Sequence, residues 1–200
     1  MFNKLSKIKS FFLILILKLI GIKIDTSSYI KNFPYLKING KAKNIFIGKN
    51  VQILGKIDLR NRENGKIIIR ENVSIEGECR FVAAREGEIV IGENTIITRG
   101  AIMNGGGNIY IGSNCILGPY NVINANDHKI GSKNFIRDKE FIYGDVKIGD
   151  NVWTGAFTSI KKDVEIKNNS IIGAHSFVTK DTEENSINYG VPTKFIKYRD

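Results

Sequence analysis

A six-residue spacing constrains the fold of this chain more than any other feature of its sequence. Between residues 148 and 178 an aliphatic residue or threonine returns at every sixth position, at Ile148, Thr154, Ile160, Ile166, Ile172 and Val178. A strand alternates with a period of two and an amphipathic helix with 3.6, so a strict six predicts short strands separated by turns. Three such strands make one triangular coil of about eighteen residues, and stacked coils form a parallel β-helix around an aliphatic core.

Upstream of residue 148 the same register appears as four copies of one phrase. The copies are IFIGKNV (45–51), IIIRENV (67–73), IVIGENT (89–95) and IYIGSNC (109–115), with third-place isoleucines at Ile47, Ile69, Ile91 and Ile111. An asparagine returns at the sixth place, at Asn50, Asn72, Asn94, Asn114, Asn151 and Asn169. Asparagine tolerates left-handed backbone, so we expect these residues to form one corner of the coils.

The register also divides the chain. At 200 residues, 42% of them hydrophobic, the chain is long enough for one domain with its own core. We assign residues 29–200 to the β-helix, with a ragged first coil and an inserted loop at 124–141. Residues 1–28 form a separate N-terminal helical segment that is basic and apolar.

This N-terminal segment leaves two interpretations open. Five lysines between residues 4 and 23 surround an apolar run at 11–17, which is too short to span a bilayer. No small-residue cleavage site follows the run, as a secretory signal would require. The segment is either an interfacial helix that lies on an anionic membrane, or a helix packed on the end of the β-helix or against a neighbouring subunit.

Charge and cysteine content limit the possible partners. The net charge of +10 suits anionic partners, including phosphorylated cofactors, acidic glycans, anionic lipid and nucleic acid. We expect no nucleic-acid partner, because the sequence has no aromatic stacking platform, zinc pattern or phosphate-binding glycine-rich loop. Cys79 and Cys115 form no CxxC motif, which favours a reducing compartment and therefore a cytoplasmic location. Cys115 fills a small inward place of the repeat, so we expect a core residue there.

The one interruption of the repeat holds a candidate catalytic residue. The register stops after Ile123 and resumes near Ile142, and a loop excluded from a solenoid lies on its surface. This loop contains His128, one of two histidines in the chain. An imidazole titrates near neutrality and can accept a proton from a hydroxyl. The alternative is a solvated loop histidine without a function.

Four stretches of the sequence resemble the hexapeptide-repeat O-acetyltransferases, which include galactoside, maltose, capsular and lipopolysaccharide-sugar enzymes. The stretches are IGSNCILGPYNVINANDH (111–128), IGDNVWTGA (148–156), IIGAHSFVTKD (171–181) and YGVPTKFIK (189–197). The resemblance implies a left-handed parallel β-helix that assembles as a homotrimer with active sites between subunits. It also implies acetyl-CoA as the co-substrate and a carbohydrate as the acceptor.

The resemblance further implies roles for individual residues. His128 takes the place of the general base that deprotonates the acceptor hydroxyl, so that the oxygen attacks the thioester directly. The places that contact the coenzyme are those of Trp153, Ala156, Ala174, Thr179, Lys180, Lys194 and Lys197. The backbone amide of Ala156 would stabilise the oxyanion. Trp153 is alternatively an outward apolar residue covered by the next subunit, and the lysines near the C-terminus are alternatively a solvated basic tail.

The acceptor is less well defined by the sequence. Asn104 and Asn126 are candidate ligands of its hydroxyl groups. The acidic pair of simple galactoside enzymes is missing, which argues against a free galactoside as the acceptor. The basic N-terminal segment points instead to a glycan built on a lipid carrier, so we expect a sugar of a surface polysaccharide, either capsule or lipopolysaccharide. If residues 1–28 lie on a membrane, the enzyme works at its cytoplasmic face. An N-acyltransferase of an amino-sugar nucleotide is the alternative on the same fold. A γ-class carbonic anhydrase needs three histidines and this chain has two, so we expect no metal.

Overall fold

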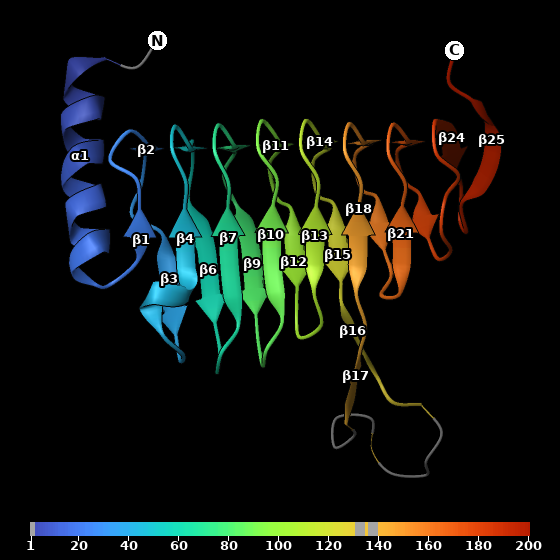
Figure 1. The fold of residues 1–200 in the computed structure, drawn as a ribbon, viewed down its shortest axis with the longest axis horizontal. Coiled ribbons are helices and arrows are strands. Elements are labelled where there is room, and N and C mark those ends of the chain that lie inside the picture. The colour runs from blue at the N-terminus through green and yellow to red at the C-terminus, as the bar shows by residue number, and fades with distance from the viewer. Residues whose placement is uncertain (1–2, 131–134, 136–139) are drawn as a thin grey trace.

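The chain forms one column of stacked triangular coils with a helix across its first end (Figure 1). The computed structural model describes residues 3–130, 135 and 140–200. Three sheets, here named walls A, B and C, form the sides of the column, and the chain passes from A to B to C in each coil. The predicted fold class, a left-handed parallel β-helix with an N-terminal helical segment, is confirmed.

Each wall is a ladder of short strands. Wall A contains β1 (Lys23–Ile24), β4 (Ile45–Ile47), β7 (Lys66–Ile69), β10 (Glu88–Ile91), β13 (Ile109–Ile111), β18 (Val146–Ile148) and β21 (Val164–Ile166). Wall B contains β2 (Tyr29–Ile30), β5 (Gln52–Ile53), β8 (Ser74–Ile75), β11 (Ile96–Ile97), β14 (Ile116–Leu117), β19 (Trp153–Thr154), β22 (Ile171–Ile172), β24 (Ser186–Tyr189) and the antiparallel β25 (Lys194–Tyr198). Wall C contains β3 (Tyr35–Ile38), β6 (Ile57–Asn61), β9 (Cys79–Ala83), β12 (Ile102–Asn104), β15 (Val122–Asn124), β20 (Ser159–Ile160) and β23 (Phe177–Val178).

The six-residue register places its anchors inside the column. All six residues from Ile148 to Val178 that follow this spacing are at most 3% exposed. Strand pairing stacks like residues on one another, and wall A carries an inward column of Ile47, Ile69, Ile91, Ile111, Ile148 and Ile166. Each such residue contributes roughly 1.5–3 kcal/mol by burial, so the stacked coils share one continuous core.

The predicted asparagine corner is confirmed. All six asparagines of the column have left-handed backbone, with φ between 54° and 59°. Their side chains also bond from coil to coil, since the Asn50 amide donates to Asn72 at 3.1 Å and the Asn72 amide donates to Asn94 at 3.2 Å. Asparagine therefore supplies both the turn and a hydrogen-bonded ladder at this corner.

We predict that Asn72→Ala lowers the free energy of unfolding by about 1–2 kcal/mol, because alanine strains a left-handed backbone and breaks the ladder. Asn72→Gly is the matched control, since glycine accepts this φ and loses only the side-chain bonds. Chemical denaturation of both variants measures the difference. Equal losses for alanine and glycine would show that the backbone conformation carries no cost at this corner.

The first end of the column is closed by helix α1 (Lys4–Leu19). The helix starts at Asn3, whose side chain accepts from the backbone of Ser6 at 2.8 Å. Ile14 and Leu17 are buried in the core of the first coil. The first coil begins at β1, directly after the helix, and includes the short 3-10 helix η1 (Ala42–Asn44) at its last corner. One of the two proposed packing modes, a helix on the end of the β-helix, is therefore present.

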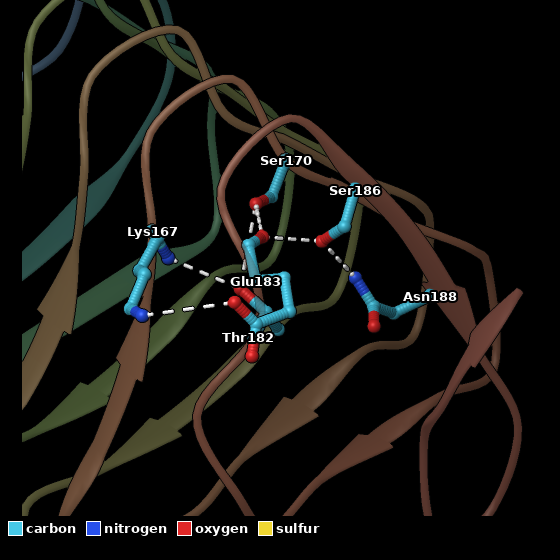
Figure 2. A network of polar contacts seen from close by, with 6 residues as sticks. All are labelled: Lys167, Ser170, Thr182, Glu183, Ser186 and Asn188. Atoms are coloured by element: carbon cyan, nitrogen blue, oxygen red, sulfur yellow. Dashed lines mark hydrogen bonds and ion pairs between the residues drawn. The ribbon is translucent and has the colours of Figure 1, made fainter. Parts of the chain in front are cut away.

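The last end of the column is closed by polar side chains (Figure 2). Ser170 donates to the carbonyl of Glu183 at 3.0 Å and lies 3.3 Å from the hydroxyl of Thr182. Ser186 donates to the same carbonyl and accepts from the side-chain amide of Asn188 at 2.7 Å. Hydrogen bonds thus satisfy the buried hydroxyls where the aliphatic core stops.

A two-stranded ribbon projects from the side of the column (Figure 1). It consists of β16 (Asn126–His128) and β17 (Phe141–Tyr143), which pair in antiparallel fashion. The ribbon leaves the coil at Asn126 and returns after Tyr143, two residues later at each end than the predicted loop of 124–141. Asn124 and Ala125 still belong to the coil, because Asn124 pairs within wall C and Ala125 is buried. Residues 131–134 and 136–139 of the predicted loop lie outside the described residues.

Candidate functional site

The ribbon holds His128 at the corner between walls C and A. Side chains alternate along a strand, so Asn126 and His128 share one face of the ribbon with their cross-strand partners Tyr143 and Phe141. The rings of His128 and Phe141 lie 4.3 Å apart between centroids. Asp127 points to the other face and accepts from the backbone amide of His128 at 2.8 Å, so its carboxylate fixes the backbone rather than the imidazole.

Neither nitrogen of the His128 imidazole has a hydrogen-bond partner among the described residues. Its Nδ1 is buried and has no hydrogen-bond partner within the described part of the chain. A buried polar atom without a partner is costly, and Asn61 Oδ1 and Arg80 Nε are the other two such side-chain atoms among the described residues. The ring packs against Phe141, and because protein atoms cover Nδ1, the nitrogen that a ligand can reach is Nε2.

Beside this face the base of the ribbon is hollowed. A cavity of about 250 Å³ is lined by Arg85, Gly87, Gly106 and neighbouring residues. The ring of Tyr143 covers Gly106, where a Cβ would lie 2.5 Å from the Tyr143 ring, so the glycines of the NGGGN turn make room for the returning strand. The Arg85 guanidinium lies 4.2 Å from the centroid of the same ring and has no ion pair among the residues that the structure describes. Arg85 and Tyr143 were not expected from the sequence.

The two candidate acceptor ligands lie near this hollow. Asn126 donates to the carbonyl of Gly105 at 3.1 Å, which ties the ribbon to the coil before it. Asn104 ends β12 one coil earlier and donates to the side chain of Asn124 at 2.9 Å. Both amides are half-buried and already bonded, so each has a fixed orientation.

The candidate coenzyme residues form two groups. Ala156 and Ala174 lie at the corner between walls B and C, on successive coils, and Trp153 lies on the outer face of wall B and is 51% exposed. Thr179 and Lys180 follow β23 beyond wall C, on the same side as the ribbon. Lys194 and Lys197 lie on the exposed edge strand β25, and Lys197 is 3.9 Å from Asp200.

A single chain does not bring the two halves of the predicted site together. His128 leaves the column between walls C and A, whereas Ala156 lies between walls B and C, so the whole width of wall C separates them. Only Thr179 and Lys180 share the corner of His128, two coils further on. The arrangement suits a site that is completed by the corner of another subunit.

The structure also reveals an aromatic stack beside Ala156 and Ala174. Tyr120 stacks on Phe157 at 5.1 Å, and Phe157 stacks on His175 at 4.9 Å. All three residues have left-handed backbone at the same corner. The sequence contains their signal as GPY (118–120), GAF (155–157) and GAH (173–175), a corner repeat that the six-residue register of inward residues does not predict. His175 therefore has a packing partner and lies on a different corner from His128.

The two cysteines are not placed for chemistry at this site. Both cysteines are free and buried, and burial raises the pKa of the Cys79 thiol to about 11, so it stays protonated at neutral pH. Cys115 is also buried in the core, as predicted. Among the described residues, no group of three or more histidine, cysteine or acidic side chains is arranged to hold a metal ion. Within the same residues, none of the helices combines the length and apolar character needed to cross a bilayer.

Comparisons with known proteins agree with this geometry. The bacterial transferase hexapeptide (six repeats) family matches residues 145–180, and a search of curated proteins finds no match. The chain is similar to the structure of the polySia specific acetyltransferase NeuO, with 27% identity over 82% of each chain and a TM-score of 0.62. It is also similar to the polysialic acid O-acetyltransferase OatWY, with 26% identity over 88% of this chain and 84% of that one and a TM-score of 0.62.

A third likeness is to a structure that contains a coenzyme. It is the hexapeptide-repeat containing acetyltransferase VCA0836 from Vibrio cholerae, complexed with acetyl coenzyme A. The similarity covers 57% of this chain and 61% of that one, with 26% identity and a TM-score of 0.52. The six-residue register, the three-walled column and these likenesses lead to the same conclusion. The chain carries the repeat of the bacterial transferase hexapeptide family at residues 145–180 and is similar in fold to hexapeptide-repeat acetyltransferases.

Proposed function

We propose that this protein is an acetyl-CoA-dependent O-acetyltransferase that acts on a sugar hydroxyl in the biosynthesis of a surface polysaccharide, either capsule or lipopolysaccharide. The observation that carries the proposal is the imidazole of His128, which is held on the ribbon and makes no hydrogen bond to the described residues through either nitrogen. The similarity to two polysialic acid acetyltransferases supports a sugar as acceptor.

In the proposed reaction each residue has one task. His128 accepts the proton of the acceptor hydroxyl while the oxygen attacks the thioester carbonyl, so a C–O bond forms and the C–S bond then breaks. The backbone N–H of Ala156 donates to the oxyanion that develops on the carbonyl. The proton held by His128 passes to the departing coenzyme thiolate. Trp153, Ala174, Thr179, Lys180, Lys194 and Lys197 bind the coenzyme arm and its phosphates in this proposal.

We further propose that the enzyme works as a homotrimer in the cytoplasm. The separation of His128 from Ala156 within one chain supports a site shared between subunits. Wall B supplies an apolar contact surface, since Ile96, Ile116 and Trp153 form an outward column and are 40–51% exposed. The two reduced thiols agree with a cytoplasmic location.

Two measurements test the proposed function. First, acetyl-CoA should raise the melting temperature of the full chain, because a ligand that binds only the folded state stabilises it. Second, transfer of labelled acetyl should be followed on matched acceptors that present a hydroxyl or an amine on the same sugar. Hydroxyl acetylation supports the proposal, whereas amine acetylation alone would favour an N-acyltransferase of an amino-sugar nucleotide. The absence of both stabilisation and transfer would reject an acetyltransferase.

Arg85 makes a specific prediction about the acceptor. Its guanidinium borders the hollow at the base of the ribbon and has no carboxylate partner among the described residues, whereas Glu86, which also lines the hollow, accepts from the Asn64 amide at 2.6 Å. Arg85 therefore suits a sugar that carries a carboxylate. We expect Arg85→Gln to raise KM roughly tenfold for a carboxylated acceptor and to leave KM for a neutral acceptor unchanged. Arg70→Gln, on another corner, is the matched control. Equal changes for both acceptors would remove Arg85 from acceptor selection.

A further inference from the structure

The positive charge of the protein lies at the end of the column that carries α1. Residues 1–57 contain eleven lysines and one acidic residue, Asp25, so their net charge is +10. The whole chain also carries +10, so residues 58–200 are neutral overall. The Asp25 carboxylate accepts from the hydroxyl and the backbone of Ser27, and these bonds lower its pKa. The net positive charge therefore attracts an anionic surface to this end.

Helix α1 has two apolar faces, and only one of them is covered. Ser10, Ile14 and Leu17 are buried against the first coil, and the Ser10 hydroxyl accepts from the backbone of Ile30 at 2.8 Å. The opposite stripe is 38–88% exposed and consists of Leu5, Ile8, Phe12, Leu15, Ile16 and Leu19. Spacings of three and four place these residues on one side of the helix. Helix α1 is the outermost element at this end of the column, so the bare stripe points away from it (Figure 1).

Two hollows beside the helix add polar binding sites. One cavity of about 520 Å³ is lined by Lys18, Lys23 and Lys49, together with Asp25 and Glu71. A second cavity of about 520 Å³ is lined on its polar side by Lys7, Ser27, Ser28 and Asn50. Lysine ammonium groups are donors that suit a phosphate group, whereas the hydroxyls of Ser27 and Ser28 already donate to Asp25 and to the carbonyl of Gly48. Each hollow therefore joins phosphate-binding groups to the margin of an apolar helix face.

We propose that this end of the protein docks on an anionic phospholipid bilayer. The outer stripe of α1 enters the interface between headgroups and acyl chains, and the surrounding lysines contact lipid phosphates. A helix that has an apolar face flanked by lysines binds membranes in this way. A second copy of the chain is a less suitable partner for this face, because two such ends, each with a net charge of +10, would repel one another.

The docking sets the height of the candidate base above the lipid. His128 follows β15 in the fifth coil, and coils lie about 4.8 Å apart, so with the thickness of the helix its imidazole is roughly 30 Å from the bilayer. A glycan anchored in the same bilayer reaches that height only as an extended chain. This step rests on the proposed function and favours a lipid-linked oligosaccharide over a single lipid-linked sugar, whereas the docking itself is independent of the reaction.

Sedimentation of the full chain with vesicles tests the electrostatic part of the docking. Vesicles of phosphatidylcholine with phosphatidylglycerol should bind the protein much more tightly than phosphatidylcholine alone, and added salt should weaken the binding. Replacing three helix lysines should weaken it on the order of 100-fold, since each lysine near the surface contributes roughly fivefold. The variant is Lys4→Gln with Lys7→Gln and Lys9→Gln. The matched control, which should bind like the wild type, is Lys147→Gln with Lys161→Gln and Lys167→Gln.

A second pair of variants tests the apolar part. Phe12→Ser with Leu19→Ser should abolish vesicle binding, whereas Phe195→Ser with Tyr198→Ser, at the opposite end, should leave it unchanged. All four side chains are exposed, so both variants should melt at the temperature of the wild type. Absence of binding by the wild type, or equal binding to neutral vesicles, would overturn the proposal. Self-association that is lost with Phe12 and Leu19, without vesicle binding, would instead assign the face to a second copy.

Discussion

Replacing His128 by alanine should lower the rate of acetyl transfer by roughly 100-fold to 10,000-fold, which is the usual contribution of a positioned general base. The loss should appear in kcat, because the imidazole is needed when the hydroxyl proton moves and not when the coenzyme binds. Acetyl-CoA should therefore raise the melting temperature of the variant as much as that of the wild type. The ring packs on Phe141 at the surface of the ribbon, so the column itself should keep its stability.

A second substitution on the same ribbon distinguishes the loss of the catalytic base from a disturbance of the ribbon structure. Ile142 lies on the opposite face and is 41% exposed, so Ile142→Ala should retain activity if the ribbon only has to present His128. Undiminished transfer by the His128 variant would remove this residue from the mechanism. A loss of transfer in His175→Ala alone would move the base to the other histidine of the chain.

The fold followed from the sequence because one physical requirement repeats along it. Each strand needs at least one inward apolar residue, and the asparagine corner needs a residue that accepts left-handed backbone. Ile69 and Asn72 meet these two requirements three residues apart, and the phrase around them is copied in successive coils. The local repeat therefore sufficed to predict the strand register, the buried positions and the corner conformation, and no knowledge of contacts between distant segments was needed.

The surface around the candidate site could be predicted only in part. The gap in the register located the ribbon. The boundaries of the ribbon depend on the pairing of Asn126 with Tyr143, and the six-residue repeat does not predict this pair. The approach of Arg85 to Tyr143 joins residues from different coils, and no six-residue spacing relates them. The stack of Tyr120 on Phe157 crosses the interruption at the ribbon, so its two members are not evenly spaced in the sequence.

The N-terminal helix shows a different limit of sequence analysis. Its apolar residues encircle the helix, so composition alone could not decide between a helix on a membrane and a helix on the column. The structure covers only the stripe of Ile14 and Leu17 and leaves Phe12 and Leu19 bare. Packing on the column and docking on a membrane are therefore compatible, because they use opposite faces of the same helix.

Ile97→Asn should destabilise the protein more than any surface substitution considered above. Ile97 is fully buried between Ile75 and Leu117 of the neighbouring coils. The change loses roughly 1.5–3 kcal/mol of burial and places an amide without partners in the core, at a further cost of about 1–3 kcal/mol. The total is a large share of the about 5–15 kcal/mol that stabilises a typical domain, so we expect a much lower melting temperature or aggregation.

The preceding residue of the same strand provides the control. Ile96 is 40% exposed on the outer face of wall B, and Ile96→Asn makes the same chemical change one position away. Because side chains alternate across a strand, this variant should unfold within about 1 kcal/mol of the wild type in the monomer. Circular dichroism during chemical denaturation compares the two. If Ile96→Asn were as damaging as Ile97→Asn, the inward register would not be what holds the column together. If only Ile97→Asn unfolds the chain, the six-residue spacing is the pattern of side chains that stabilises it.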